Sequence, residues 1–273
     1  MRAARPAAAL LTLTAAGCAM FTADSVVRSS DSLLPPVAAP PDAVSLQLVF
    51  IERPVNDPLL GSCLWNELDQ LAGVPFERRQ TILENGFRFG TAASQPPPTL
   101  GELLKVGLAG EYDGPAGFVN NRQVAMRSGA ATDVMVSHDP ADWSVDFARD
   151  GHPEPHEFGG ARGFIRVEVS EVQDGWCEVR LTPEVHHGAE RVRHEAGDDG
   201  WSLSQSQQID PVPDASFSVH LNLHEMLVVS AGVGSPRRVG NHFFRREEDG
   251  RLMQRVLVLR AASMKQDASL ASR

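Results

Sequence analysis

Polar and apolar residues alternate most regularly in the segment GFIRVEVSEVQDGWCEVRLTPEV, residues 163–185. A period of two is typical of a β-strand that buries one face, so we predict strands at residues 164–172 and 176–185. Asp174 and Gly175 separate them. Asp-Gly favours a two-residue hairpin turn, because such turns need positive φ values that Gly adopts without strain. The pattern therefore predicts an antiparallel hairpin.

Shorter β patterns surround this hairpin, at residues 122–137, 215–232 and 251–261. Nothing in this region has the i, i+3, i+4 spacing of a helix longer than about one turn. We predict an antiparallel β domain over residues 123–262, with roughly six to eight strands. The remaining residues, 263–273, are predicted to be a disordered tail.

The preceding region, residues 44–110, alternates between strand and helix patterns. Four leucines share one face of a predicted helix at residues 59–71, and Gly86 is a good residue to end a second helix that starts near Pro75. In chain order the predicted elements are a strand at 44–52, helices at 59–71 and 75–85, a strand at 87–92 and a helix at 99–107. The predicted fold class is therefore α+β, a small N-terminal βααβα unit followed by a mainly antiparallel β domain.

The first residues, MRAARPAAALLTLTAAGCAM, combine two arginines with an apolar run of ten residues, Ala7 to Ala16. That run is too short to cross a bilayer, which takes roughly 20 residues, but it suits a secretory signal. The small residues before Cys18 resemble the lipobox of bacterial lipoproteins, although Ala15 stands where that family prefers Leu. The resemblance implies a signal peptide at 1–17, a lipid on Cys18 and a membrane as partner.

Residues 18–43 are rich in Ser, Ala and Pro and have no helix or strand period, so we predict a flexible tether. Ala19 follows the cysteine in place of the acidic residue that some bacteria use as a retention signal. We therefore expect the chain to be anchored to the outer membrane, facing the periplasm.

Mass spectrometry of the mature N-terminus tests the anchor. We expect cleavage before Cys18 and a cysteine that carries acyl chains. Such chains would hold the protein on the membrane, because each buried CH₂ group contributes about 0.8 kcal/mol to membrane binding. An unmodified Cys18, or a mature chain that starts at another residue, would contradict the prediction.

The formal net charge of -10 and the aromatic content of 6 % argue against nucleic acid as a partner. Phosphate binding needs clustered Lys and Arg, and base stacking needs aromatic platforms. The two other cysteines, Cys63 and Cys177, are far apart in sequence, in a helix pattern and a strand pattern. An exported compartment would permit a disulfide, but we favour two buried free thiols.

The order of β segments after residue 122 resembles the core domain of bacterial secretins, the outer-membrane ring channels of secretion and pilus systems. The resemblance lies in the hairpin at 163–185 and in VAMRSGAATDVMVS (124–137), FSVHLNLHEMLVVSAGV (217–233), VGNHFF (239–244) and LMQRVLVLRA (252–261). It implies a secretin relative that kept the β scaffold and lost the pore. A secretin relative that still forms a pore is a further hypothesis. Ring-shaped oligomers that resist heat in detergent would support it.

Three groups of histidines are candidate metal or catalytic sites. His186 and His187 lie at the predicted end of a strand, and His194 lies in the polar loop that follows. His152 and His156 lie in a proline-rich loop with Glu154 and Glu157. His220, Asn222 and His224 lie on the wet face of a strand. Adjacent strand residues face opposite ways, so His186 and His187 do not easily share one ion unless the chain turns at Gly188. We therefore assign no metal, cofactor or catalytic residue.

The sequence also contains no G-x-S-x-G elbow and no P-loop lysine. Our first hypothesis is accordingly a non-enzymatic envelope lipoprotein that works in assembly or scaffolding, through β-edge contacts with itself or with envelope or secretion proteins. The alternative is a metal-binding or metal-dependent hydrolytic envelope protein that uses His152, His156, His186, His187 or His194.

Overall fold

The computed structural model describes residues 43–108, 118–137, 139–149, 151–173, 175–197 and 200–264. The predicted signal peptide, Cys18 and the tether up to residue 42 lie outside these residues. The strands are β1 (Ala43–Pro54), β2 (Phe87–Ala92), β3 (Phe118–Arg127), β4 (Ala131–Met135), β5 (Ala141–Arg149), β6 (His152–Gln173), β7 (Trp176–Gly197), β8 (Gly200–Pro211), β9 (Phe217–Asn222), β10 (Met226–Ala231), β11 (Arg245–Glu248) and β12 (Arg251–Met264). The helical elements are η1 (Leu59–Cys63), α1 (Leu64–Glu67), α2 (Phe76–Glu84), α3 (Pro98–Leu108), η2 (Pro213–Ala215) and α4 (Val239–Phe244).

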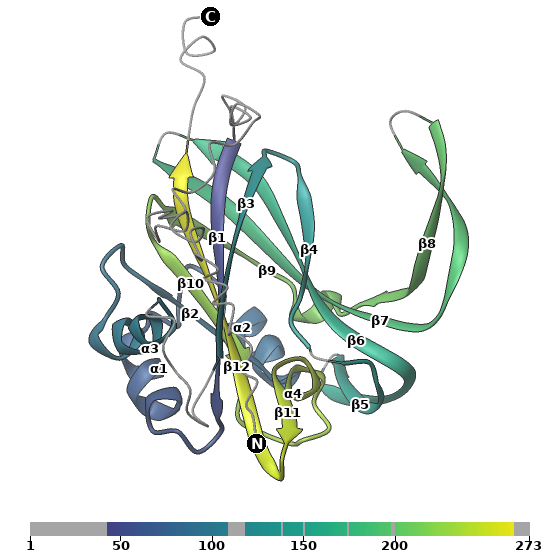
Figure 1. Ribbon diagram of the computed structural model, residues 1–273, viewed down its shortest axis with the longest axis horizontal. Coiled ribbons are helices and arrows are strands. Elements are labelled where there is room, and N and C mark those ends of the chain that lie inside the picture. Colours follow the sequence, from purple (N-terminus) through teal and green to yellow (C-terminus); the bar gives the residue numbers. More distant parts are fainter. Residues whose placement is uncertain are drawn as a thin grey trace, which may run out of the picture. The chain divides into compact units, whose positions relative to one another are not determined.

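These strands form two antiparallel sheets (Figure 1). The first sheet has the order β2-β10-β12-β1-β3, and β11 pairs with β12 at its side. The second sheet has the order β4-β6-β7-β8, and in addition β5 pairs with β6 and β9 pairs with β7. The mainly antiparallel β architecture agrees with the predicted α+β class.

The first sheet joins residues from both ends of the described chain. β1 pairs with β12 along almost its whole length, from Val44 opposite Met264 to Pro54 opposite Met253. β2 pairs with β10 instead of with β1. The predicted order of strand, helix, helix, strand and helix occurs, but an independent βααβα unit is not confirmed, since β10 and β12 lie between its two strands. β12 also extends to Met264, two residues into the predicted tail.

Side chains cover the first sheet on both faces, which explains its continuous apolar strands such as MLVVSA in β10. In β1, Val49 and Ile51 pack under α1 and α3, whereas Leu46 and Leu48 face the second sheet. The helices contribute Leu64, Trp65, Leu100 and Leu103 to their side of the core. No helix in the described part of the chain has the length and apolar character needed to cross a membrane.

The predicted hairpin is confirmed in the second sheet. Gln173 pairs with Trp176, and Gly175 between them has a φ of 86°. Ile165, Val167, Val179 and Leu181 point into the core, while the alternate residues form the outer face of the sheet. Both strands are longer than predicted, because β5 extends the pairing of β6 and β8 extends that of β7.

The predicted helix at residues 59–71 ends early. α1 stops at Glu67 and the backbone of Leu68 is extended. The N–H of Asp69 donates to the carbonyl of Thr91 at 2.9 Å, and the reciprocal bond measures 2.8 Å. These bonds add a bridge to the edge of β2, and Leu71, predicted on the core face, is therefore 61 % exposed.

A corner after α2 holds the two sheets together. The buried Asn85 side chain accepts a hydrogen bond from the Ala148 N–H at 2.9 Å and donates to the Ala148 carbonyl at 3.0 Å. Gly86, which follows with a φ of 83°, lies against Gly240 of α4 so closely that a Cβ on Gly240 would be 2.1 Å from the Gly86 carbonyl oxygen. α2, β5 and α4 therefore meet at one point.

Next to this corner, α4 places the buried Phe243 between the sheets. Its ring meets Phe87 of β2 edge to face at 5.2 Å and Trp143 of β5 at 5.7 Å. It also fills the space over Gly163 of β6, where an added Cβ would be 2.8 Å from the ring. One aromatic side chain thus contacts strands of both sheets.

The two described cysteines do not form a disulfide, as predicted. Cys177 is buried in β7, whereas Cys63 at the end of η1 is exposed, so the expectation that both are buried was wrong for Cys63. Burial raises the pKa of the Cys177 thiol from 9.0 to about 11.

We predict that Asn85→Ala lowers the free energy of unfolding by about 1–3 kcal/mol, because it leaves the N–H and carbonyl of Ala148 without their partner. Gln80→Ala, on the exposed face of the same helix, removes only a side-chain bond to Glu84 and should change stability by less than about 0.5 kcal/mol. Urea denaturation of the two variants measures the difference, and equal effects would contradict the role of the corner.

We also predict that iodoacetamide at pH 8 labels Cys63 in the native protein and leaves Cys177 unlabelled. A pKa of about 11 reduces the reactive thiolate about 100-fold relative to an ordinary thiol, and burial blocks access. Peptide mass spectrometry gives the two rates, and labelling in guanidinium chloride, where both sites should react alike, is the control. Rapid native labelling of Cys177 would show that β7 opens.

Candidate functional site

The central histidines do not mark the end of a strand. β7 continues through them to Gly197, with His186 opposite Ile209 and His187 opposite Gln208 of β8. The prediction that the strand leaves the sheet here was wrong, because β8 supplies a new partner where β9 ends. His194 also lies in β7 instead of a loop, although its side chain is outside the described part of the structure.

The two adjacent histidines have separate partners, as expected for neighbours on a strand. His186 Nε2 lies 3.1 Å from Glu184 Oε2, and its ring stacks on Phe164 with a centroid distance of 4.0 Å. His187 Nε2 lies 3.1 Å from Asp210 Oδ2, and its ring packs on Phe158. Gly188 does adopt positive φ, at 74°, but the chain continues along β8 and does not bring the two rings together.

The structure instead brings His186 together with two carboxylates that sequence reasoning missed. One ligand atom each from Asp133 of β4, Glu184 and His186 of β7 lies within 4.8 Å of the other two. The Glu184 side chain is 8 % exposed and that of His186 is 13 % exposed. Among the described residues this is the one group of three or more His, Cys, Asp or Glu side chains with that spacing.

Part of this cluster is visible in the sequence in retrospect. Glu184 and His186 are two residues apart on a predicted strand, and such residues share a face. Asp133 gives no such signal, because its approach depends on β4 pairing with the far side of β6. Arg166, which lies opposite Asp133 in that pairing, places its Nη1 3.7 Å from the Asp133 carboxylate.

The second predicted group, His152 to Glu157, is a strand and not a loop. These residues begin β6 and pair with β5, with His156 opposite Val145. The His156 ring packs against Phe147 at 4.4 Å and stacks on Phe158 at 5.9 Å. His156 Nε2 is 4.0 Å from Glu154, whose other neighbour is Arg149 at 3.4 Å.

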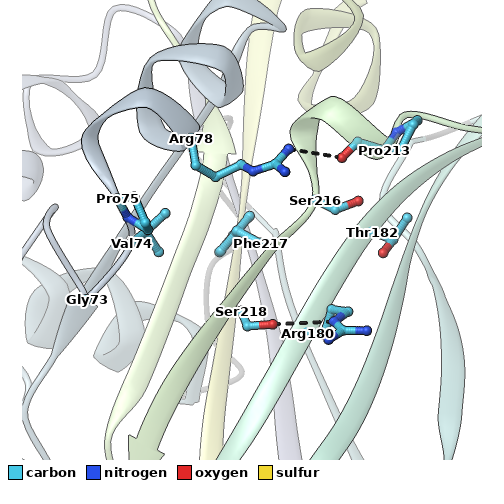
Figure 2. A pocket seen from close by; sticks show the side chains of 10 residues that line it. All are labelled: Gly73, Val74, Pro75, Arg78, Arg180, Thr182, Pro213, Ser216, Phe217 and Ser218. Atoms are coloured by element: carbon cyan, nitrogen blue, oxygen red, sulfur yellow. Dashed lines mark hydrogen bonds between the residues drawn. The ribbon is translucent and has the colours of Figure 1, made fainter.

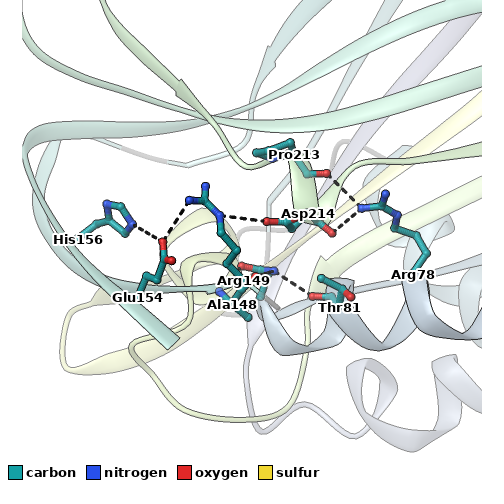
Figure 3. A network of polar contacts seen from close by, with 9 residues as sticks. Arg78, Thr81, Ala148, Arg149, Glu154, His156, Pro213 and Asp214 are labelled. Carbon is teal, nitrogen blue, oxygen red and sulfur yellow. Dashed lines mark hydrogen bonds and ion pairs between the residues drawn. The ribbon is translucent and has the colours of Figure 1, made fainter. Parts of the chain in front are cut away.

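This contact belongs to a chain of polar contacts that joins β6 to η2 and α2 (Figure 3). Arg149 reaches Asp214 at 3.6 Å, and Arg78 of α2 donates to the carbonyl oxygens of Pro213 and Asp214 at 3.3 and 3.1 Å. Exposed pairs of this kind contribute little stability individually. The network joins elements, and it does not bring His152 and His156 to the central histidines.

The third group is split between a strand and a turn. His220 and Asn222 lie on the exposed face of β9, as predicted, and His220 meets the edge of Trp176 at 4.9 Å. His224 lies beyond the end of β9 with a φ of 70°, so it does not share their face as we had expected.

A pocket of about 590 Å³ lies where the start of α2 meets β7 and β9 (Figure 2). Arg78 and Arg180 line it together with Gly73, Val74, Pro75, Thr182, Pro213, Ser216, Phe217 and Ser218. Cations and hydroxyl groups are the donors an anion needs. Both guanidinium groups, however, already donate within the chain, Arg78 to η2 and Arg180 Nε to Ser218 Oγ at 3.4 Å.

The sequence matches no protein-family model and no curated protein. Two solved structures resemble the chain weakly. The ETEC pilotin–secretin complex AspS–GspD matches at 11 % identity with a TM-score of 0.25, over 84 % of this chain and 50 % of that one. The type II secretin GspD from enteropathogenic Escherichia coli matches at 11 % identity with a TM-score of 0.21, over 80 % of this chain and 65 % of that one.

The chain therefore spans less than two thirds of the length of each of these two matched chains. TM-scores this low carry no argument about fold, partners or activity. The comparisons show a weak likeness to type II secretins and nothing finer.

Proposed function

We propose that the protein is a lipid-anchored envelope protein that acts by assembly and not by catalysis, with the outer part of β7 and β8 as its contact element. The single observation that carries this proposal is the pairing of residues 191–197 with 200–206. The pairing of β6 with β7 ends at Arg162 opposite His186. Beyond that point β7 and β8 form a two-stranded ribbon (Figure 1), which pairs with no other described strand.

Such a ribbon presents two unpaired edges. A two-stranded hairpin in water is marginally stable, and each edge has backbone N–H and carbonyl groups to offer another strand. A third strand added at an edge would bind through main-chain hydrogen bonds, the mode known as β-augmentation. A strand from a second copy of this chain, or from another envelope protein, would bind to an edge of the ribbon in this way.

The ribbon also has a defined root. The register between β7 and β8 is irregular between His187 and Arg191, where Gly188 has positive φ. The Gln207 side chain donates to the Gly188 carbonyl at 2.8 Å and to the Gly160 carbonyl at 3.3 Å. The two Gln207 bonds therefore tie the base of the ribbon to β6 and β7.

The anchoring and non-catalytic parts of the proposal are supported by the sequence. The lipobox-like stretch ending at Cys18 and the secretin-like order of β segments favour an envelope location. The absence of an elbow or P-loop motif favours assembly over catalysis.

A photo-crosslinking residue placed at Leu203 in the ribbon, in living cells, tests the contact. We expect crosslinked species of higher mass from position 203 and none from the same residue at Leu252, an exposed leucine of β12. A variant in which Asn-Gly replaces residues 188–207 would close the hairpin directly, because His187 already pairs with Gln208. It should keep its thermal midpoint and lose its assemblies.

Unchanged assemblies in that variant, or equal crosslinking from both positions, would refute the ribbon as the contact element.

A further inference from the structure

The outer face of the second sheet carries a buried carboxylate, Glu184, that contacts no arginine or lysine in the described part of the chain. Glu184 is 6 % exposed. Its contact is His186, two residues further along β7 on the same face, with His186 Nε2 3.1 Å from Glu184 Oε2. A buried carboxylate is costly unless a cation or hydrogen-bond donors compensate its charge.

Another buried carboxylate in the same protein shows the usual solution. Glu52 is 3 % exposed and contacts two arginines, Arg246 at 2.7 Å and Arg255 at 3.2 Å. Glu184 has instead a second acid, Asp133, close by. Two carboxylates and an imidazole around one point form a set of ligands that a divalent cation would neutralise.

The spacing of these ligand atoms suits one ion. In a tetrahedral zinc site with bonds of about 2.0–2.1 Å, ligand atoms are about 3.4 Å apart. Glu184 Oε2 and His186 Nε2 are already 3.1 Å apart, and a carboxylate oxygen of Asp133 lies within 4.8 Å of one ligand atom of each of these two residues. The Asp133 side chain is 39 % exposed. The imidazole nitrogen favours zinc and similar transition metals over calcium or magnesium, which prefer oxygen ligands.

The neighbours of these ligands would hold them in place. The ring of His186 stacks on Phe164 with an interplanar angle of 23°, which fixes the plane of the imidazole. Arg166 contacts Asp133 from the side, the kind of outer contact that orients a ligating carboxylate. Both supporting residues come from β6, between the two strands that carry the ligands.

We propose that Asp133, Glu184 and His186 form a site for one divalent transition metal ion, with Zn²⁺ as the natural occupant. Three protein ligands leave a fourth position for water or for a group from a partner. The site is distinct from the ribbon that carries the proposed assembly function, and it does not depend on that function.

Metal analysis of the full-length chain, purified in detergent with no polyhistidine tag, tests the proposal. We expect one zinc per chain after dialysis against a zinc buffer and a higher thermal midpoint with zinc than with chelator. Bound Co²⁺ should give the visible absorption of a tetrahedral site. Asp133→Asn and Glu184→Gln should each weaken zinc binding at least tenfold and remove that absorption.

Matched controls separate this site from chance binding by other histidines. His187→Gln changes the adjacent histidine, which contacts Asp210 and not the cluster, and should leave zinc affinity within twofold. His156→Gln should also have no effect. Chains that bind no stoichiometric zinc would overturn the proposal. So would zinc binding that survives Asp133→Asn and Glu184→Gln, or that is lost in His156→Gln, with thermal midpoints in chelator showing that each variant is folded.

Discussion

The contact between the corner after α2 and α4 is the constraint on which the packing of the two sheets depends. The Asn85 amide takes the place of a strand partner for Ala148, so the end of a helix is fixed to the second sheet by two hydrogen bonds. The Asn85 carbonyl then accepts from the Gly240 N–H at 2.9 Å, and the Gly86 carbonyl accepts from the Gly232 N–H at 2.8 Å. The backbone of α4 is in direct contact with the backbone of the corner here, so a side chain on Gly240 has no space. The same contact fixes the position of the Phe243 ring over Gly163.

That constraint has consequences for the outer face of the second sheet. With the inner face filled by Ile165, Val167 and Phe243, the alternate residues of β6 and β7 must point outward. Phe164, Glu184 and His186 therefore share one surface, and a register slip of one residue would reverse every one of them. The proximity of Glu184 to His186 thus follows from the packing of the core, although neither side chain belongs to it.

The sequence predicted those parts of the fold that local patterns determine. The hairpin at residues 163–185, the helix that ends before Gly86 and the strand at 87–92 are confirmed, since each depends on alternation or on a turn residue within a few positions. The pairing of β1 with β12 joins residues about two hundred positions apart, and no local pattern indicates it. The helix at 59–71 was predicted too long because its end depends on the bridge between Asp69 and Thr91, a tertiary contact.

The same distinction explains the candidate site. Alternation showed that His186 and His187 face opposite ways, and the structure agrees. It did not reveal that β8 continues the pairing of β7, so the histidines were placed at a strand end when they lie inside the sheet. Asp133 could not be found from the sequence, since its approach to Glu184 requires β4 to lie beside β6.

β7 contributes to both the proposed metal site and the proposed contact ribbon, and the two features use different sections of the strand. Asp133, Glu184 and His186 lie where β7 is backed by β6 and by the core, so their positions are set by packing. The ribbon begins after the irregularity at Gly188, where the core no longer contributes and only β8 pairs with the strand. A ligand that bridges β4 and β7 would stiffen the packed section without adding a contact to the ribbon. A strand added to the ribbon edge would in turn leave Glu184 as buried as before. The two features are therefore physically independent, although only a few residues separate them along the chain.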